Sequence, residues 1–174
     1  MSKLKLIITA VLLLCINICS AQKVVTRYID KFLPISRELS EKWGIPVSII
    51  LGVSIHESGT GTSINCRELK NYFGVKGKNH LKKRHSNYKH YANAEESFND
   101  FCRILSTKKF YHRLKGNMDY NLWLHAMNQH HYAGAKEVWV QKVKAIIRKY
   151  KLNKYDKVSD TAPTQDESEE KSSN

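Results

Sequence analysis

An apolar run that ends in a single carboxylate constrains this chain more than any other feature. Residues 49–55 hold five large aliphatic side chains, and Glu57 follows them just before the turn-forming residues 58–61. Apolar side chains on every face predict a helix that is mostly buried, and Gly59 suits the left-handed position that ends such a helix. The run therefore predicts a buried helix with Glu57 at its carboxyl-terminal end.

This position gives Glu57 two possible interpretations. A carboxylic acid in apolar surroundings keeps its proton to higher pH, and can then donate that proton near neutral pH. Glu57 is also the only acidic residue between Glu41 and Glu68. Alternatively, Glu57 is an ordinary solvated residue at the end of a helix. The helical pattern alone leaves both interpretations open.

The first 21 residues have the pattern of an export signal. Lys3 and Lys5 precede an apolar stretch over residues 6–14, and small residues precede a possible cleavage site before Gln22. The apolar stretch is too short to favour a membrane span. We therefore expect an exported protein, periplasmic or secreted, that is not stably inserted in a membrane after cleavage.

The charge of the chain is distributed unevenly. Residues 22–155 hold 25 Lys and Arg against 10 Asp and Glu, whereas residues 156–174 hold two basic and six acidic residues. We expect one domain over residues 22–156, as a monomer, and a disordered acidic tail over residues 157–174. On an exported protein, a basic surface favours anionic cell-wall or envelope polymers over nucleic acid, for which no recognition motif is present. A solubilising charge excess without a specific partner is the alternative.

Helical periodicity dominates the predicted domain. The apolar stripe over residues 28–39 predicts a helix that Pro34 breaks or kinks. Asn93 and Glu96 have the spacing of a capping box at the start of a later helix. Further helices are predicted near residues 64–70, 119–127 and 138–150.

Residues 75–91 differ from the rest of the domain. They include glycine and asparagine, few apolar residues and no acidic residue. This composition predicts a loop or a short β-hairpin that stands out from the helical body. The expected fold class is therefore mainly α, with a small β or irregular lobe.

The histidines and cysteines do not predict a metal site. His80, His85 and His90 recur at five-residue intervals, whereas histidine pairs that bind zinc on a helix are usually four apart. We expect surface histidines, no metal and no other cofactor. Cys66 and Cys102 either pair in an oxidising compartment or stay as two buried free thiols.

Four ordered blocks of sequence resemble a known family. They read YIDKFLPISRELSEKWGIPVSIILGVSIHESGTGTS, INCRELKNYFGVKG, YANAEESFNDFCRIL and HHYAGAKEVWVQKVKAIIRKYKLNKYD. Over residues 28–156 they are similar to the glucosaminidase domains of bacterial autolysins and flagellar wall hydrolases, glycoside hydrolase family 73. The resemblance covers nearly the whole predicted domain.

The resemblance implies a lysozyme-like α+β fold that hydrolyses the β-1,4 bond after N-acetylglucosamine in peptidoglycan. Glu57 matches the catalytic acid of the family, and Tyr132 matches a tyrosine that lines the catalytic site. The expected partners are therefore peptidoglycan glycan strands. The predicted substrate-binding residues are Ser58, Asn71, Phe73, Lys76 and Tyr91.

The chain departs from the family pattern in its lobe. Many members carry an acidic residue there to position water, but residues 75–93 of this chain contain none. Water is then activated by another group, or the 2-acetamido group of the substrate assists the reaction. The alternative function is a non-catalytic glycan-binding envelope protein that keeps the same fold.

Overall fold

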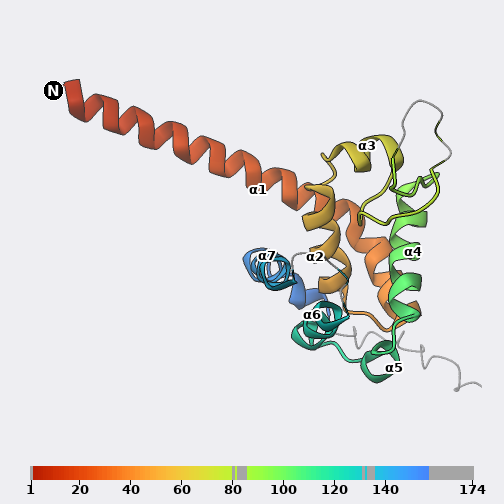
Figure 1. The fold of residues 1–174 in the computed structure, drawn as a ribbon. Helices are drawn as coiled ribbons and strands as arrows, with labels where there is room; N and C mark the ends of the chain where they lie inside the picture. Colours follow the sequence, from red (N-terminus) through yellow and green to blue (C-terminus); the bar gives the residue numbers. More distant parts are fainter. Residues whose placement is uncertain (1, 80, 82–85, 131, 133–135, 157–174) are drawn as a thin grey trace, which may run out of the picture.

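The computed structural model describes residues 2–79, 81, 86–130, 132 and 136–156, with side chains from residue 22 onward (Figure 1). The predicted tail over residues 157–174 lies outside the described residues. The fold is mainly helical, as expected. Its elements are α1 (Ser2–Trp43), α2 (Val47–Ser58), α3 (Ile64–Leu69), α4 (Ala94–Ser106), α5 (Tyr111–Leu114), α6 (Tyr120–Gln129), α7 (Lys136–Lys149) and the 3-10 helix η1 (Leu152–Tyr155).

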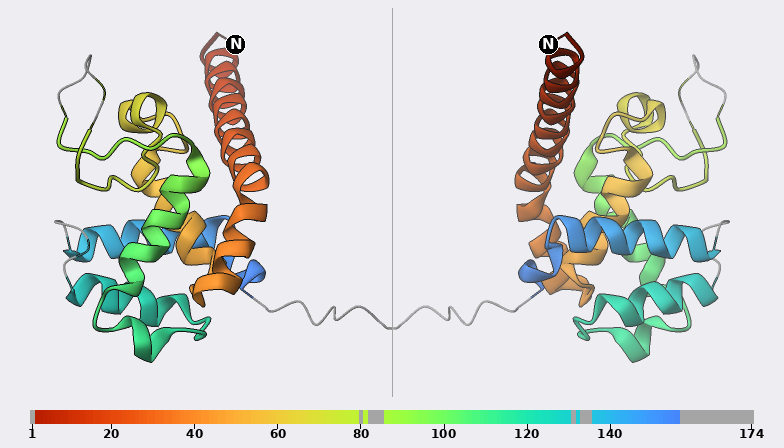
Figure 2. Two further views of the ribbon diagram at one scale, coloured as in Figure 1. Left: turned by 90° about the vertical axis from the view of Figure 1, so that its right-hand side faces the viewer. Right: turned by 90° about the vertical axis from the view of Figure 1, so that its left-hand side faces the viewer.

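Helix α2 lies at the centre of the domain, where it contacts α1, α6, α7 and η1 (Figures 1 and 2). Ten of its twelve residues are buried. Gly52 lets α7 approach closely, because a Cβ at this position would stand only 2.9 Å from Cγ1 of Ile147. The buried helix that the apolar run predicts is therefore confirmed.

Both ends of α2 are fixed by specific contacts. Pro46 offers no side-chain cap at the start of the helix. Asp156 takes this role, although it is 108 residues from Ser48 in the chain. Its carboxylate accepts hydrogen bonds from Ser48 N at 2.7 Å and from Ser48 Oγ at 2.6 Å. At the other end, Gly59 adopts the left-handed conformation and its N–H binds the carbonyl of Ile55. The predicted glycine stop is confirmed.

Helix α1 continues through Pro34, so the predicted break at this residue is wrong. A proline inside a helix removes one backbone hydrogen bond. Here buried side chains on both sides of the proline, Phe32 and Leu39 among them, belong to the core, and α1 packs on α2 and α4. This tertiary packing offsets the lost hydrogen bond. Across the part of the chain that the structure describes, no helix has the length and apolar content needed to cross a membrane.

The predicted capping box opens α4. Oδ1 of Asn93 accepts a hydrogen bond from Glu96 N at 2.9 Å, and Oε2 of Glu96 accepts one from Ala92 N at 3.0 Å. The short elements α5 and η1 have no counterpart in the sequence prediction. Both cysteines of the described domain, Cys66 and Cys102, are free thiols buried in the protein.

The lobe, residues 75–91, connects α3 to α4. Its described backbone holds an antiparallel bridge between Lys76 and Tyr88, flanked by hydrogen bonds from Gly77 N to Asn87 O and from Lys89 N to Val75 O. Within the described residues this single bridge is the whole β content, so the lobe is irregular rather than a regular hairpin. His80 and His85 lie outside the described residues.

The cap on α2 generates a prediction about stability and pH. Burial raises the pKa of Asp156 from 3.8 to about 6, although the two hydrogen bonds from Ser48 lower it. The folded protein therefore binds this proton more tightly than the unfolded chain does. Its contribution to stability is fully present below the unfolded pKa and is lost as pH rises through about 6.

Asp156→Asn removes this titration. We expect the free energy of unfolding of the wild type, relative to this variant, to decrease by roughly 2 to 3 kcal/mol between about pH 4 and pH 7. Urea unfolding at a series of pH values measures the difference. Asp119→Asn, at an exposed carboxylate near Asp156, is the matched control. Parallel pH curves for the wild type and Asp156→Asn would contradict the prediction.

Candidate active site

Glu57 lies in the last turn of α2, where α2, α7 and the lobe meet. Its side chain is half-buried. Oε1 accepts a hydrogen bond of 2.7 Å from Nε1 of Trp139, which comes from the first turn of α7 and is 4 % exposed. Oε2 lies 3.4 Å from the place that a Cβ of residue 74 would occupy. The only carboxylate on α2 is therefore held from one side by Trp139 and approached from another by the backbone of Gly74, the residue before the lobe.

The backbone conformation at residue 74 favours glycine. Its φ of +64° lies in the left-handed region, which side chains other than glycine adopt at a cost. A Cβ here would also contact Glu57 Oε2, and it would stand 3.9 Å from Cε1 of Tyr88. The backbone of Gly74 thus lies close to the carboxylate, with no side chain of its own between them.

Tyr132 reaches the same site from the segment between α6 and α7. Its half-buried ring packs on Trp139 with centroids 5.6 Å apart, and it meets Phe101 edge-on at 5.8 Å. Burial, followed by the negative charge of Glu57, raises the pKa of the Tyr132 hydroxyl well above its usual value of 10. The phenol is therefore neutral at physiological pH and available as a hydrogen-bond donor.

A chain of aromatic rings connects this site to α1. Phe73 stacks on Phe101 with centroids 4.1 Å apart and planes 8° from parallel, and it meets Phe98 edge-on at 4.9 Å. Phe98 in turn stacks on Phe32 of α1 at 4.9 Å. Phe73, a predicted substrate-binding residue, is 2 % exposed and supports the site from within the core.

Asn71 ties the two sides of the lobe together. Its Nδ2 donates to the carbonyls of Val75 and Lys89, both at 2.8 Å, and its Oδ1 accepts from Val75 N at 3.0 Å. The side chain is 1 % exposed. Its hydrogen bonds therefore hold the lobe backbone at Val75 and Lys89, next to Gly74.

A buried charge fixes the end of the lobe to α4. Asp100 accepts hydrogen bonds from Tyr91 Oη at 2.7 Å, from Lys89 Nζ at 2.8 Å and from Arg103 Nη2 at 2.6 Å. Burial raises the pKa of Asp100, but the donors from these three side chains outweigh it and the net pKa is lowered. Tyr91, predicted to bind substrate, is buried in this network.

Ser58 also has an internal role. Its Oγ donates to Ser54 O at 2.6 Å and accepts from Gly61 N at 2.8 Å, so it secures the turn after α2. Lys76, on the lobe, is exposed. Of the five predicted substrate-binding residues, Lys76 is the one whose side chain faces solvent, and the other four hold the framework around Glu57.

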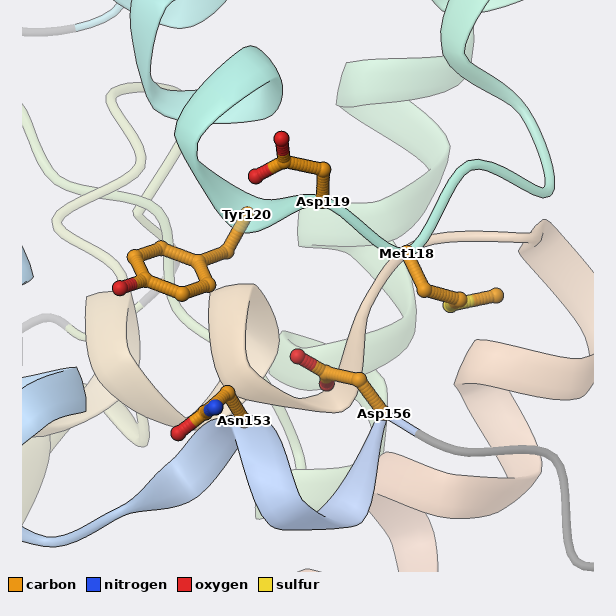
Figure 3. Close-up of a pocket in the computed structure, with 5 residues that line it drawn as sticks. All are labelled: Met118, Asp119, Tyr120, Asn153 and Asp156. Carbon is orange, nitrogen blue, oxygen red and sulfur yellow. The ribbon is translucent and has the colours of Figure 1, made fainter.

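A separate pocket lies at the opposite end of α2 (Figure 3). It has a volume of about 350 Å³ and is lined by Met118, Asp119, Tyr120, Asn153 and Asp156. Because Asp156 caps the start of α2 and Glu57 lies in its last turn, the pocket is not part of the Glu57 site. Among the described residues, no three His, Cys, Asp or Glu side chains are grouped as a metal site requires.

Sequence reasoning missed Trp139. A signal for its burial was present, because Trp139, Val143 and Ile147 recur every four residues and form the buried face of α7. That pattern places the indole in the core. It does not reveal the contact with Glu57, which is 82 residues away in the chain.

The helical fold and the match to a family model define the class of this protein as a glycoside hydrolase. The chain belongs to the glucosaminidase family: the family model, described as mannosyl-glycoprotein endo-β-N-acetylglucosaminidase, matches residues 33–152. No curated protein matches the chain.

Solved structures share the fold. The catalytic domain of the autolysin Auto from Listeria monocytogenes has a TM-score of 0.64 at 20 % identity, covering 76 % of this chain and 88 % of that domain. The glycoside hydrolase domain of FlgJ from Salmonella typhimurium has a TM-score of 0.58 at 21 % identity, with 73 % and 88 % covered. A peptidoglycan hydrolase from Sphingomonas sp. A1 has a TM-score of 0.60 at 19 % identity, with 74 % and 91 % covered.

The Asp100 network generates a second stability prediction. Asp100→Asn keeps the side-chain shape but removes the charge that binds Lys89 and Arg103. We expect the free energy of unfolding near neutral pH to fall by about 2 to 3 kcal/mol, because charge-assisted hydrogen bonds are lost from a buried site.

The pH dependence has the opposite sign to that of Asp156. Because the folded pKa of Asp100 is lowered, its stabilisation is present above the usual carboxyl pKa of 3.8 and is lost as pH falls through the lower folded value. Urea unfolding tests this, with Glu95→Gln on the exposed first turn of α4 as the control. The prediction fails if Asp100→Asn is no less stable than this control.

Proposed function

We propose that this protein is an exported peptidoglycan hydrolase in which Glu57 is the general acid. Glu57 protonates the leaving oxygen of the β-1,4 bond after N-acetylglucosamine. The observation that carries the proposal is the position of Glu57: a half-buried carboxylate at the end of a buried helix, hydrogen-bonded to Trp139 and beside Gly74. Membership of the glucosaminidase family supports the reaction class.

The kinds of protein found among the structural relatives support the choice of substrate. They include an autolysin, a peptidoglycan hydrolase and a flagellar glycoside hydrolase domain. The export pattern over residues 1–21 would deliver the protein to the compartment that contains peptidoglycan. Exposed Lys76 and Lys78 on the lobe would attract the acidic peptide stems of the glycan.

Glycoside hydrolysis also needs a group that stabilises the sugar cation or activates water. The lobe supplies no carboxylate, and Asp100 is engaged by three side-chain donors. The neutral hydroxyl of Tyr132 is suited to donate a hydrogen bond to the sugar or to the water. These facts favour assistance by the 2-acetamido group of the substrate, which needs no second protein carboxylate.

A non-catalytic glycan-binding envelope protein is the second candidate. The lobe without an acidic residue is the observation that favours it. It predicts that the wild-type protein sediments with purified sacculi but releases no soluble fragments over a broad range of pH and salt.

The direct test is Glu57→Gln, which keeps the shape of the side chain and removes the acidic proton. We expect release of reducing sugar from purified peptidoglycan to fall by roughly 100-fold or more, while the circular dichroism spectrum stays unchanged. Glu41→Gln, at an exposed position on α1, is the matched control and should keep full activity.

Mass spectrometry of the digest defines the bond that is cut. Fragments with N-acetylglucosamine at the reducing end support the proposal, whereas N-acetylmuramic acid at that end would show a muramidase. Full activity of Glu57→Gln would exclude Glu57 as the acid.

A further inference from the structure

The two oxygens of Glu57 have different surroundings. Oε1 accepts a hydrogen bond of 2.7 Å from the indole N–H of Trp139, and Trp139 is almost fully buried. Oε2 lies beside Gly74, the residue before the lobe, where a Cβ would stand 3.4 Å away. One oxygen is thus occupied by a protein donor, and the other is next to a glycine.

We propose that Trp139 is a positioning residue whose indole N–H holds Oε1 of Glu57 and thereby assigns the transferable proton to Oε2. This inference rests on the proposed role of Glu57 as the acid. An indole N–H can only donate a hydrogen bond. A proton on Oε1 directed at Trp139 would bring two donors face to face, so Oε1 stays the acceptor in both protonation states and Oε2 carries the proton.

The aromatic contacts explain how the indole keeps its own position. Tyr132 packs on Trp139 at 5.6 Å and is itself held edge-on by Phe101 at 5.8 Å, and Phe101 stacks on Phe73. Further along α7, Ile147 packs against Gly52 of α2. Trp139 and Glu57 therefore lie on two helices whose separation is fixed by close packing.

Holding the carboxyl group in one orientation is expected to raise the rate of the reaction. A free glutamate at a helix end samples several rotamers, and each one directs the acidic proton differently. A fixed carboxyl group has already lost this freedom before substrate binds, so the reaction does not have to restrict it. The expected cost of losing the indole donor is therefore a lower rate at saturating substrate, with a smaller effect on KM.

Titratable side chains near Glu57 come from α2, from the segment before α7 and from the lobe. His56 precedes it on α2, Tyr132 approaches from the segment before α7, and Tyr88 lies beside Gly74 in the lobe. Trp139 does not titrate, so it reports on the carboxylate without adding a protonation step of its own.

Nuclear magnetic resonance tests the contact without any measurement of activity. The chain has three tryptophans. Nε1 of Trp43 donates to Asn99 Oδ1 at 3.2 Å and Nε1 of Trp123 to Asn117 O at 2.8 Å, so their partners do not titrate. In ¹⁵N-labelled protein, we expect the indole resonance of Trp139 to move with pH, and this movement to disappear in Glu57→Gln. The other two indoles are internal references.

Two results of the resonance experiment would overturn the inference. One is a Trp139 indole resonance that does not move with pH in the wild-type protein. The other is a resonance whose titration is unchanged in Glu57→Gln. Both are measured on proteins that keep Trp139, so the test does not depend on the folding of a tryptophan variant.

Trp139→Phe tests the kinetic consequence. We expect the rate at saturating soluble glycan fragments to fall by roughly 10- to 100-fold. KM should change by a smaller factor, because the lost hydrogen bond is made to Glu57. Trp43→Phe, which removes an indole hydrogen bond remote from Glu57, should leave the rate and KM unchanged. An unchanged rate at saturating substrate in Trp139→Phe would contradict the inference.

The two proposals fail in different ways. If Glu57→Gln keeps its activity while the Trp139 resonance follows Glu57 in the wild type, the general acid is elsewhere and the hydrogen bond is only structural. If Glu57→Gln is inactive and the Trp139 resonance is independent of pH, Glu57 is the acid but Trp139 does not orient it.

Discussion

The burial of α2 is the constraint on which the rest of this structure depends. A helix that is apolar on every face has to be enclosed, and α1, α6, α7 and η1 together enclose it (Figure 2). Its exposed backbone groups then need partners at both ends. Asp156 binds the first turn and the left-handed Gly59 closes the last one. These contacts also set the position of Glu57, because it lies one residue before the end of α2.

Two further sets of contacts fix the position of the lobe relative to α2. The contacting aromatic rings from Phe32 to Trp139 join α1, α4 and α7 in one apolar layer next to Glu57. The charged network around Asp100 and the amide of Asn71 hold the lobe backbone at the edge of this layer. Apolar packing thus fixes one side of the site, and buried polar groups fix the side on which substrate is proposed to bind.

Much of this could be predicted from local sequence. The buried helix, its glycine stop and the capping box of α4 depend on residues within a few positions of one another, and all three are confirmed. The break at Pro34 is wrong because tertiary packing of α1 outweighs one missing hydrogen bond. Asn71, Phe73 and Tyr91 were expected to contact substrate, and in the fold their polar atoms and rings are directed at other parts of the protein.

The sequence by itself determined the family, and it is the source of the proposal that Glu57 is the general acid. It also determined the mainly helical fold class. The family follows from short motifs, and the fold class follows from helical periodicity. Only the tertiary structure decided what surrounds that carboxylate. Trp139 is 82 residues from Glu57, and Asp156 is 108 residues from Ser48. No local pattern encodes such pairs, since each forms only when close packing of the helices brings the two side chains together.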